Sequence, residues 1–290
     1  MTATATSVFR RTSHLLFNRT YMSTLSAVDH KVSLHPWLPP PPPSSYNNMA
    51  SNSHTLDLVQ PTLVEKGIGR IAFLRHANTL PKPVVENGTD FDRQVSPKGQ
   101  EQAKEAGQTF ARDLTPFYSK MFASPSPRTV ETAKIVLETI PNHDGIEIDT
   151  SLYELYDMSA QPGSGRLFEK HGYAPLQTYV NDGTNKQDCV DARIGFGTYS
   201  HTCIHALLNA LLADTSAPPS LNSDTTTTLW VVGHAMYLPS IVLGLATLLD
   251  CDEESKDLVL ATNTKEAEGY LLDVEHKNVR LLQRPSTSSE

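Results

Sequence analysis

Three apolar segments of the sequence each end at a polar side chain and run into a helical pattern. They cover residues 69–76, 119–128 and 229–240. Strands that alternate with helices in this way predict an α/β fold with an open, mostly parallel sheet and helices on both faces. Ligands of such sheets bind at the carboxyl ends of the strands. We therefore expect the polar ends of the three segments to form one site.

The polar side chains at these ends suit a phosphate group. Arg75 and His76 end the first segment, Arg128 ends the second, and His234 follows the last strand. Guanidinium groups bind phosphate through paired, charge-assisted hydrogen bonds, and a neutral imidazole is a nucleophile near neutral pH. Taken singly, Arg128 could cap a helix start and His234 could be an ordinary buried histidine. Their coincidence at three junctions favours a phosphate site.

The motifs and their order resemble those of the histidine phosphatase superfamily, also called phosphoglycerate mutase-like. They are Arg-His-Ala-Asn-Thr at 75–79, Val-Ser-Pro-Lys-Gly-Gln-Glu-Gln-Ala at 95–103, Ser-Pro-Ser-Pro-Arg-Thr-Val-Glu-Thr-Ala at 124–133, Leu-Tyr-Glu at 152–154 and Val-Gly-His at 232–234. The resemblance extends over about residues 68–284 and implies a phosphoglycerate mutase-like fold. The Gly-rich loops of nucleotide-binding proteins are absent from the sequence, and nothing in it calls for a cofactor or a metal ion.

The resemblance also implies roles for the site residues, which fit the chemistry of phosphoryl transfer. His76 would attack phosphorus and form a phosphohistidine that water hydrolyses. The groups that bind the phosphoryl oxygens would be Arg75, Arg128, His234 and Thr79. Glu154, held as a neutral acid, would protonate the leaving group. The nearby acids Glu147, Asp149, Asp157 and Glu169 remain alternatives to Glu154.

Three positions depart from the family pattern. Ala77 stands where glycine usually follows the nucleophile, and Ala235 stands where glycine commonly follows the second histidine. Alanine fits there only if the backbone φ is negative. Lys82 occupies the place of a phosphate-binding Asn. We expect these changes to preserve the core chemistry and to alter the rim of the pocket.

The sequence favours a phosphatase over a mutase. The stretch after Glu154, residues 155–165, has none of the basic residues that would grip a second anionic group of a phosphoglycerate. The segment from Asp92 and Arg93 to Gly99 is similar to one in short phosphohistidine phosphatases. Phosphorylated small molecules and phosphoproteins both remain substrate candidates. The alternatives are a mutase-like phosphotransferase and a catalytically lapsed protein that binds a phosphorylated ligand or acts as a scaffold.

Composition restricts the partners. The 290-residue chain has a net charge of −8, which argues against general binding to nucleic acid. Its three cysteines form no Cys-x-x-Cys pair and indicate free thiols. We expect no membrane span, and a homodimer is an open alternative.

The N-terminus differs from the rest in composition. We divide the chain into an extension at 1–66, a catalytic domain at 67–285 and a tail at 286–290. The first 28 residues contain Arg, Ser and Thr but no Asp or Glu, which is typical of a transit peptide. Mitochondrial import is the expectation, with a plastid or cytoplasmic location as the alternatives. The prolines at 39–43 indicate an extended linker.

Local patterns predict several further elements of the domain. Ser96 and Ser126 each precede a proline and a helical pattern, so both are expected to cap helices. The first of these helices should run over 97–113. We also expect a helical insertion over the pocket at 165–191 and a helix at 191–213. Residues 268–274 and 278–283 should form a hairpin.

Overall fold

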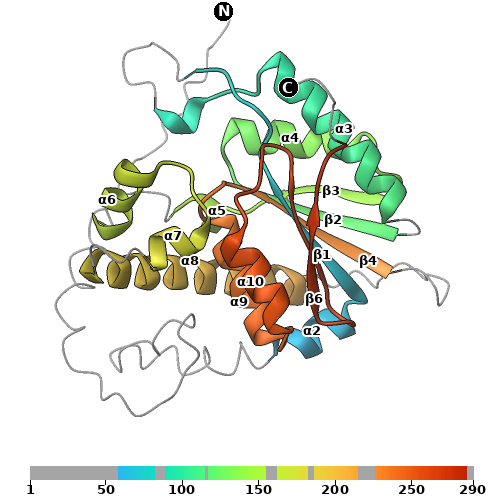
Figure 1. Cartoon of the computed structure of the whole chain (residues 1–290). Coiled ribbons are helices and arrows are strands. Elements are labelled where there is room, and N and C mark those ends of the chain that lie inside the picture. The colour runs from blue at the N-terminus through green and yellow to red at the C-terminus, as the bar shows by residue number, and fades with distance from the viewer. Residues whose placement is uncertain are drawn as a thin grey trace, which may run out of the picture.

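The strands form one open sheet with β1 and β4 at its centre (Figure 1). The computed structural model describes residues 58–81, 89–114, 117–154, 162–181, 186–214 and 226–285. Within them the strand order is β3-β2-β4-β1-β5-β6. The strands are β1 (Ile68–Arg75), β2 (Phe117–Ala123), β3 (His143–Ile148), β4 (Thr226–Gly233), β5 (Gly269–Asp273) and β6 (Asn278–Leu282).

Helices fill most of the connections between these strands. They are α2 (Val59–Glu65), the 3₁₀ turn η1 (Asp90–Asp92), α3 (Pro97–Asp113), α4 (Pro127–Leu137), α5 (Ser151–Glu154), α6 (Pro162–His171), α7 (Leu176–Val180), α8 (Lys186–Ala213), α9 (Leu238–Leu248) and α10 (Glu253–Ala261). The predicted alternation of strands and helices is therefore present.

The four strands β3, β2, β4 and β1 are parallel to one another. β5 runs antiparallel to β1, and β6 runs antiparallel to β5. The predicted open, mostly parallel sheet is confirmed, and the predicted C-terminal hairpin is the β5–β6 pair. Because β4 lies between β1 and β2, the carboxyl ends of the first, second and fourth strands lie side by side.

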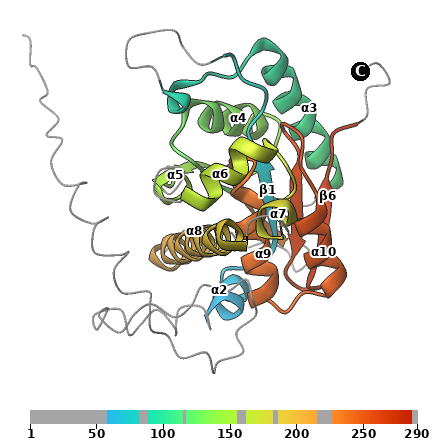
Figure 2. The ribbon, with the colours of Figure 1, turned by 60° about the vertical axis from the view of Figure 1, so that its left-hand side comes forward.

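Two hydrophobic cores cover the two faces of the sheet. In β1, Phe73 belongs to the core on the side of α8 and α9, whereas Leu74 belongs to the core on the side of α3 and α4. Val231 and Val232 of β4 divide in the same way. Successive strand residues point to opposite faces, so a strand covered on both faces is apolar throughout. The helices lie on both sides of the sheet, as predicted (Figure 2).

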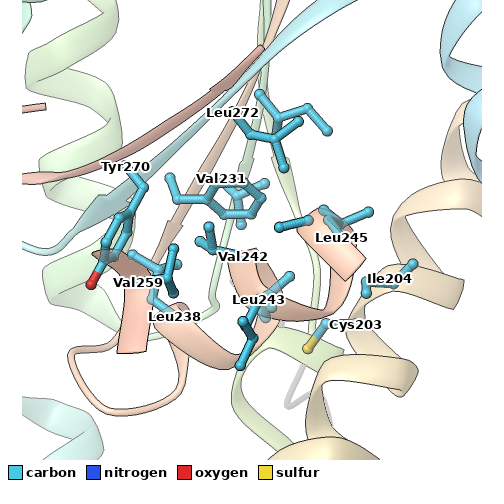
Figure 3. Close-up of a cluster of buried hydrophobic side chains, with 14 of the residues drawn as sticks. Cys203, Ile204, Val231, Leu238, Val242, Leu243, Leu245, Val259, Tyr270 and Leu272 are labelled. Carbon is cyan, nitrogen blue, oxygen red and sulfur yellow. The ribbon is translucent and has the colours of Figure 1, made fainter. Parts of the chain in front are cut away.

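The core on the α8–α9 side is shown in Figure 3. Leu238 and Val242 of α9 lie against Val231 and Leu272 of the sheet, with Cys203 of α8 below them. All five side chains are almost completely buried. This packing fixes α9, which begins directly after the end of β4.

The insertion predicted at 165–191 is helical, but its boundaries differ from the prediction. It consists of α6, α7 and the first turn of α8, which begins at Lys186 and not at Asp191. Asp188 in this first turn is buried and accepts hydrogen bonds from Arg166 of α6. An acidic residue is favourable at a helix N-terminus, and this pairing extends α8 beyond the apolar pattern.

The two predicted serine caps behave differently. Ser96 Oγ accepts a hydrogen bond from the Gly99 N–H at 3.0 Å, as expected of a cap, and α3 has the predicted bounds. Ser126 occupies the N-cap position of α4 without a hydrogen bond from its side chain to the helix backbone. Its hydroxyl lies instead 2.8 Å from that of Thr129. Ser126 is thus the N-cap residue and Pro127 the first residue of the helix, as predicted, but the expected hydrogen bond to the cap side chain is absent.

The described part of the chain begins within the predicted N-terminal extension. Val59 and Leu63 of α2 are buried in the core beside β1 and α8, so α2 packs with the domain although it lies before residue 67. The transit-peptide pattern, the proline stretch and the tail at 286–290 lie outside the described residues. None of the helices that the structure describes has the length and apolar character needed to cross a membrane.

Candidate active site

The sheet register brings the three predicted junctions together. The His76 N–H donates to the Gly233 carbonyl at 3.0 Å, so the end of β1 lies beside the end of β4. On the other side of β4, the Ser124 N–H donates to the Val232 carbonyl at 3.1 Å. The last bonds of the ladder therefore place His76, Ser124 and His234 next to one another.

His76 is held as a neutral imidazole with a defined tautomer. Its Nδ1 lies 2.8 Å from the Ala77 carbonyl oxygen, which can only accept a hydrogen bond, so Nδ1 carries the proton. Burial, together with the positive charges of Arg128, Arg75 and Arg93, lowers the pKa of His76 to about 3 against the opposing effect of the Ala77 carbonyl. Nε2 therefore keeps a lone pair at neutral pH.

Ala77 fits the position after the nucleophile without backbone strain. Among the described residues, positive φ angles outside glycine occur at four other positions, Asn142, Asp250, Ala267 and Lys277. The backbone φ is therefore not positive at Ala77 or at Ala235, which is the condition for alanine at these positions. The Ala77 side chain is fully buried, and its N–H donates to Thr132 Oγ1 at 3.0 Å.

A hydrogen-bond network holds the loop that follows His76. Asn78 donates from its N–H to Gln102 Oε1 at 2.9 Å and from Nδ2 to Glu266 Oε1 at 3.0 Å. Asn78 Oδ1 accepts from Ser96 at 2.6 Å. Gly99 lies so close to the Asn78 carbonyl that a Cβ would clash with it. The start of α3 thus supports the segment that carries the nucleophile.

Arg128 projects from the first turn of α4 and is only 1% exposed. Its Nη2 lies 2.8 Å from Asp90 Oδ2 and 3.4 Å from His234 Nδ1, and its Nη1 donates to the Asp90 carbonyl. A buried arginine needs such acceptors to offset the cost of removing its charge from water. The guanidinium group therefore lies beside His234 and is engaged by Asp90.

His234 is almost fully buried beside the nucleophile. The ring centroids of His76 and His234 are 5.5 Å apart. His234 Nε2 lies 3.0 Å from Ser124 Oγ. Burial lowers the pKa of His234 well below its ordinary value, and the charges of Arg128 and Arg75 act in the same direction.

Arg75 is the last residue of β1, and its side chain is held by contacts with Thr264 and Tyr173. Its Nη1 donates to the Thr264 carbonyl at 2.7 Å, and its guanidinium carbon lies 5.3 Å from the centre of the Tyr173 ring. Arg75 contributes to the lowered pKa of both His76 and His234. The structure thus brings Arg75, His76, Arg128 and His234 into one cluster, as predicted.

The sequence match to known families falls on the same residues. Residues 71–161 match the model described as histidine phosphatase superfamily (branch 1). The match contains four of the five motifs quoted above. The fifth, at 232–234, lies beyond the matched range, and the sheet register places its His234 beside the others. The predicted resemblance to the histidine phosphatase superfamily is confirmed. No curated protein matches the chain.

Solved structures similar to this chain include several phosphatases. A protein histidine phosphatase SixA complexed with tungstate is 14% identical, with 73% of this chain and 93% of that chain covered and a TM-score of 0.41. The Entamoeba histolytica phosphoserine phosphatase in complex with 3-phosphoglyceric acid is 18% identical, with coverage of 76% and 98% and a TM-score of 0.43. The mycobacterial glucosyl-3-phosphoglycerate phosphatase is 18% identical, with coverage of 73% and 96% and a TM-score of 0.41. These likenesses assign no substrate to the chain.

The structure leaves the roles of two predicted site residues untested. Thr79 forms an isolated β-bridge with Val95, further along the loop. Glu154 is the last residue of α5, but its side chain lies outside the described residues, as does Lys82. The roles assigned to Thr79 and Glu154 therefore stay predictions.

Two aromatic residues that the sequence did not single out lie over the cluster. The Tyr153 ring is 5.3 Å from the His234 ring, and the Phe91 ring is 4.8 Å from the Tyr153 ring. Burial raises the pKa of Tyr153, and the charge of Arg128 opposes this rise. Tyr153 precedes Glu154 in the quoted Leu-Tyr-Glu motif, and this position is the signal that could have identified it.

Asp90 is the third residue that sequence reasoning missed. Its carboxylate and carbonyl both contact Arg128. The available signal was its spacing from Arg93, three residues later, which places both side chains on one turn. In the part of the chain that the structure describes, no three His, Cys, Asp or Glu side chains are arranged to hold a metal ion.

Proposed function

We propose that the protein is a phosphatase that hydrolyses phosphomonoesters or phosphorylated protein side chains through a phosphohistidine on His76. The observation that carries the proposal is the hydrogen bond between His76 Nδ1 and the Ala77 carbonyl. It leaves the lone pair of Nε2 available beside a buried arginine. A neutral imidazole with a fixed tautomer is a nucleophile that needs no prior deprotonation.

The proposed reaction has two steps. Nε2 of His76 attacks phosphorus, the bond between phosphorus and the leaving oxygen breaks, and the leaving oxygen takes a proton from an acid. Water then attacks the phosphohistidine, the N–P bond breaks, and inorganic phosphate leaves. Arg75 and Arg128 would neutralise the phosphoryl oxygens during both steps. Glu154 is the proposed acid.

Hydrolysis is favoured over return of the phosphoryl group to a bound product. A mutase has to bind a second anionic group of its substrate while the phosphohistidine persists. The segment at 155–165 that follows Glu154 contains no Lys or Arg. The sequence beside the proposed acid thus offers no cation for that second group.

Turnover of a chromogenic aryl phosphate in the presence of a chelator tests the proposal. We expect His76→Ala to lower the rate by about a thousandfold or more, because removing a nucleophile leaves only the binding groups. His143→Ala removes an exposed histidine from the edge strand β3 and serves as the matched control. The absence of turnover on a panel of aryl phosphates, sugar phosphates, phosphopeptides and phosphohistidine protein would contradict the proposal.

The covalent step has its own test. Rapid acid-free quenching during turnover should trap phosphate that is labile to acid and stable to base, and peptide mapping should place it on His76. Base-labile phosphate, or phosphate on another residue, would contradict the mechanism even if the protein were a phosphatase.

A further inference from the structure

The guanidinium group of Arg128 is engaged by an anion of the protein itself. Asp90 provides two acceptors, its Oδ2 at 2.8 Å from Nη2 and its main-chain carbonyl on Nη1. The Arg128 side chain is 2% exposed, whereas that of Asp90 is 47% exposed. The arginine is therefore fixed within the site, and its carboxylate partner sits at the surface.

The same carboxylate also contacts a second arginine. Asp90 Oδ1 lies 3.4 Å from Arg93 Nη1, so the carboxylate bridges Arg93 and Arg128. The charges of both arginines lower the pKa of His76, which means that both act at the nucleophile. The Asp90 carboxylate therefore lies between two positive charges that would also attract the negative charge of a phosphoryl group.

Asp90 engages both terminal nitrogens of Arg128. Nη1 and Nη2 contact Asp90, and Nη2 also faces His234 Nδ1. The buried Nε has no hydrogen-bond partner among the described residues. Paired recognition of a phosphate needs two adjacent N–H groups of one guanidinium. Nε is buried, so the relevant pair is that of Nη1 and Nη2, and a phosphate that binds this pair must displace an acceptor of Asp90.

We propose that Asp90 is an internal counter-ion that competes with the phosphoryl group for Arg128 and thereby sets the affinity of the site for phosphate. This inference rests on the proposed function, since it assumes that Arg128 binds phosphate. Asp90 compensates the buried charge of Arg128 in the empty site, and the incoming phosphate replaces it. Asp90 is thus a determinant of substrate and product affinity.

The position of Asp90 permits this exchange. Asp90 begins η1, a single 3₁₀ turn in which no residue is buried. The turn is held by the capping box in which Thr89 and Asp92 bond to each other. Movement of the Asp90 side chain therefore breaks no contact of the hydrophobic core.

Titration calorimetry of the full-length protein with inorganic phosphate tests the proposal. We expect Asp90→Asn and Asp90→Ala to bind phosphate about tenfold more tightly than the unmodified protein, because a hydrogen bond to a charged group contributes about that factor. Asp113→Asn, at the opposite end of α3 from the Asn78 contact, removes the same charge from an exposed position and should change the affinity less than twofold. Circular dichroism establishes that each variant is folded. Both Asp90 variants remove the carboxylate charge, so both should bind phosphate more tightly.

The outcomes separate this inference from the proposed function. Unchanged or weaker phosphate binding by both folded Asp90 variants would overturn the inference, because Asp90 would then position Arg128 for the ligand. A gain equal to that of Asp113→Asn would also overturn it, because the effect would be one of net charge. Phosphate binding is measured without turnover, so tighter binding by the Asp90 variants would support the inference even if His76 proved to form no phosphohistidine.

Discussion

The hydroxyl of Ser124 lies 3.0 Å from Nε2 of His234, at the ends of two neighbouring parallel strands. Arg128 has only donors, and its Nη2 faces Nδ1 on the other side of the same ring. Nδ1 therefore accepts, Nε2 carries the proton, and Ser124 is its acceptor. Arg128 thus fixes the tautomer of the second histidine of the site, and Ser124 helps to fix its orientation.

The contact with Ser124 predicts a defined loss of activity on substitution. Ser124→Ala should lower kcat about tenfold, because one oriented hydrogen bond contributes about 1 kcal/mol and His234 would lose its fixed orientation. Steady-state kinetics with an aryl phosphate measures the change. Ser119→Ala is the matched control, since its buried hydroxyl in β2, the strand that ends just before Ser124, accepts from Trp230 at 3.1 Å, away from the site. The control should lower stability and leave kcat unchanged, and an equal loss of kcat in both variants would refute the role of Ser124.

The lowered pKa values of His76 and His234 predict that acid destabilises the fold. Both histidines titrate near 6.5 in the unfolded chain, whereas the folded state keeps His76 neutral down to a pKa of about 3. Below pH 6.5 the unfolded chain therefore binds protons that the folded chain does not, and the free energy of unfolding falls as the pH falls toward 3. Urea denaturation at about pH 7.5 and about pH 5 measures this slope. His76→Gln should reduce it, and the exposed control His143→Gln should not.

Substitution of Ala77 by the glycine usual in the family should preserve activity and lower stability. No positive φ is required at Ala77, so glycine brings no relief of strain. It adds flexibility to the unfolded chain and removes a buried methyl group, which together cost about 1–2 kcal/mol. Urea denaturation measures this loss, and the rate with an aryl phosphate should stay within about threefold. A large gain in rate from Ala77→Gly would show that the alanine restricts catalysis.

The cysteines should be inert in the native protein. Cys189, Cys203 and Cys251 form no disulfide and are buried. Burial raises the pKa of Cys251 to about 11 and that of Cys203 higher still, so the reactive thiolate is scarce at neutral pH. A disulfide reagent such as DTNB should modify them slowly in buffer and completely in guanidinium chloride. Rapid modification of the folded protein would contradict this prediction.

The sequence predicted the elements that carry strong local signals. Residues 71–74 and 229–232 are apolar because both sheet faces are covered, and both strands were correctly predicted to end at the site. α3 was predicted to the residue because Ser96 and Pro97 define its start. Thr79 belongs to the same motif as His76. Its bridge to Val95, however, depends on pairing with a segment sixteen residues further on, which no local pattern reveals.

Other features depend on contacts between segments that are distant in sequence. The start of α8 is set by the pairing of Asp188 with Arg166, twenty-two residues away, and apolar periodicity has no information about it. The bond between Asp90 and Arg128 spans thirty-eight residues. The Tyr153 ring was overlooked because its place beside His234 follows from the turn between β3 and α5, where the periodic patterns end.

The placement of the proposed catalytic groups on adjacent strands has a consequence for how the proposed activity would be lost. His76 and Ser124 are bonded through their backbones to the last residues of β4, and we expect these central strands to exchange their amide hydrogens only on global unfolding. Local fraying of loops or of the outer strands therefore leaves the two histidines in register. Inactivation by heat or denaturant should coincide with global unfolding, so enzyme activity would report directly on the folded fraction of the domain.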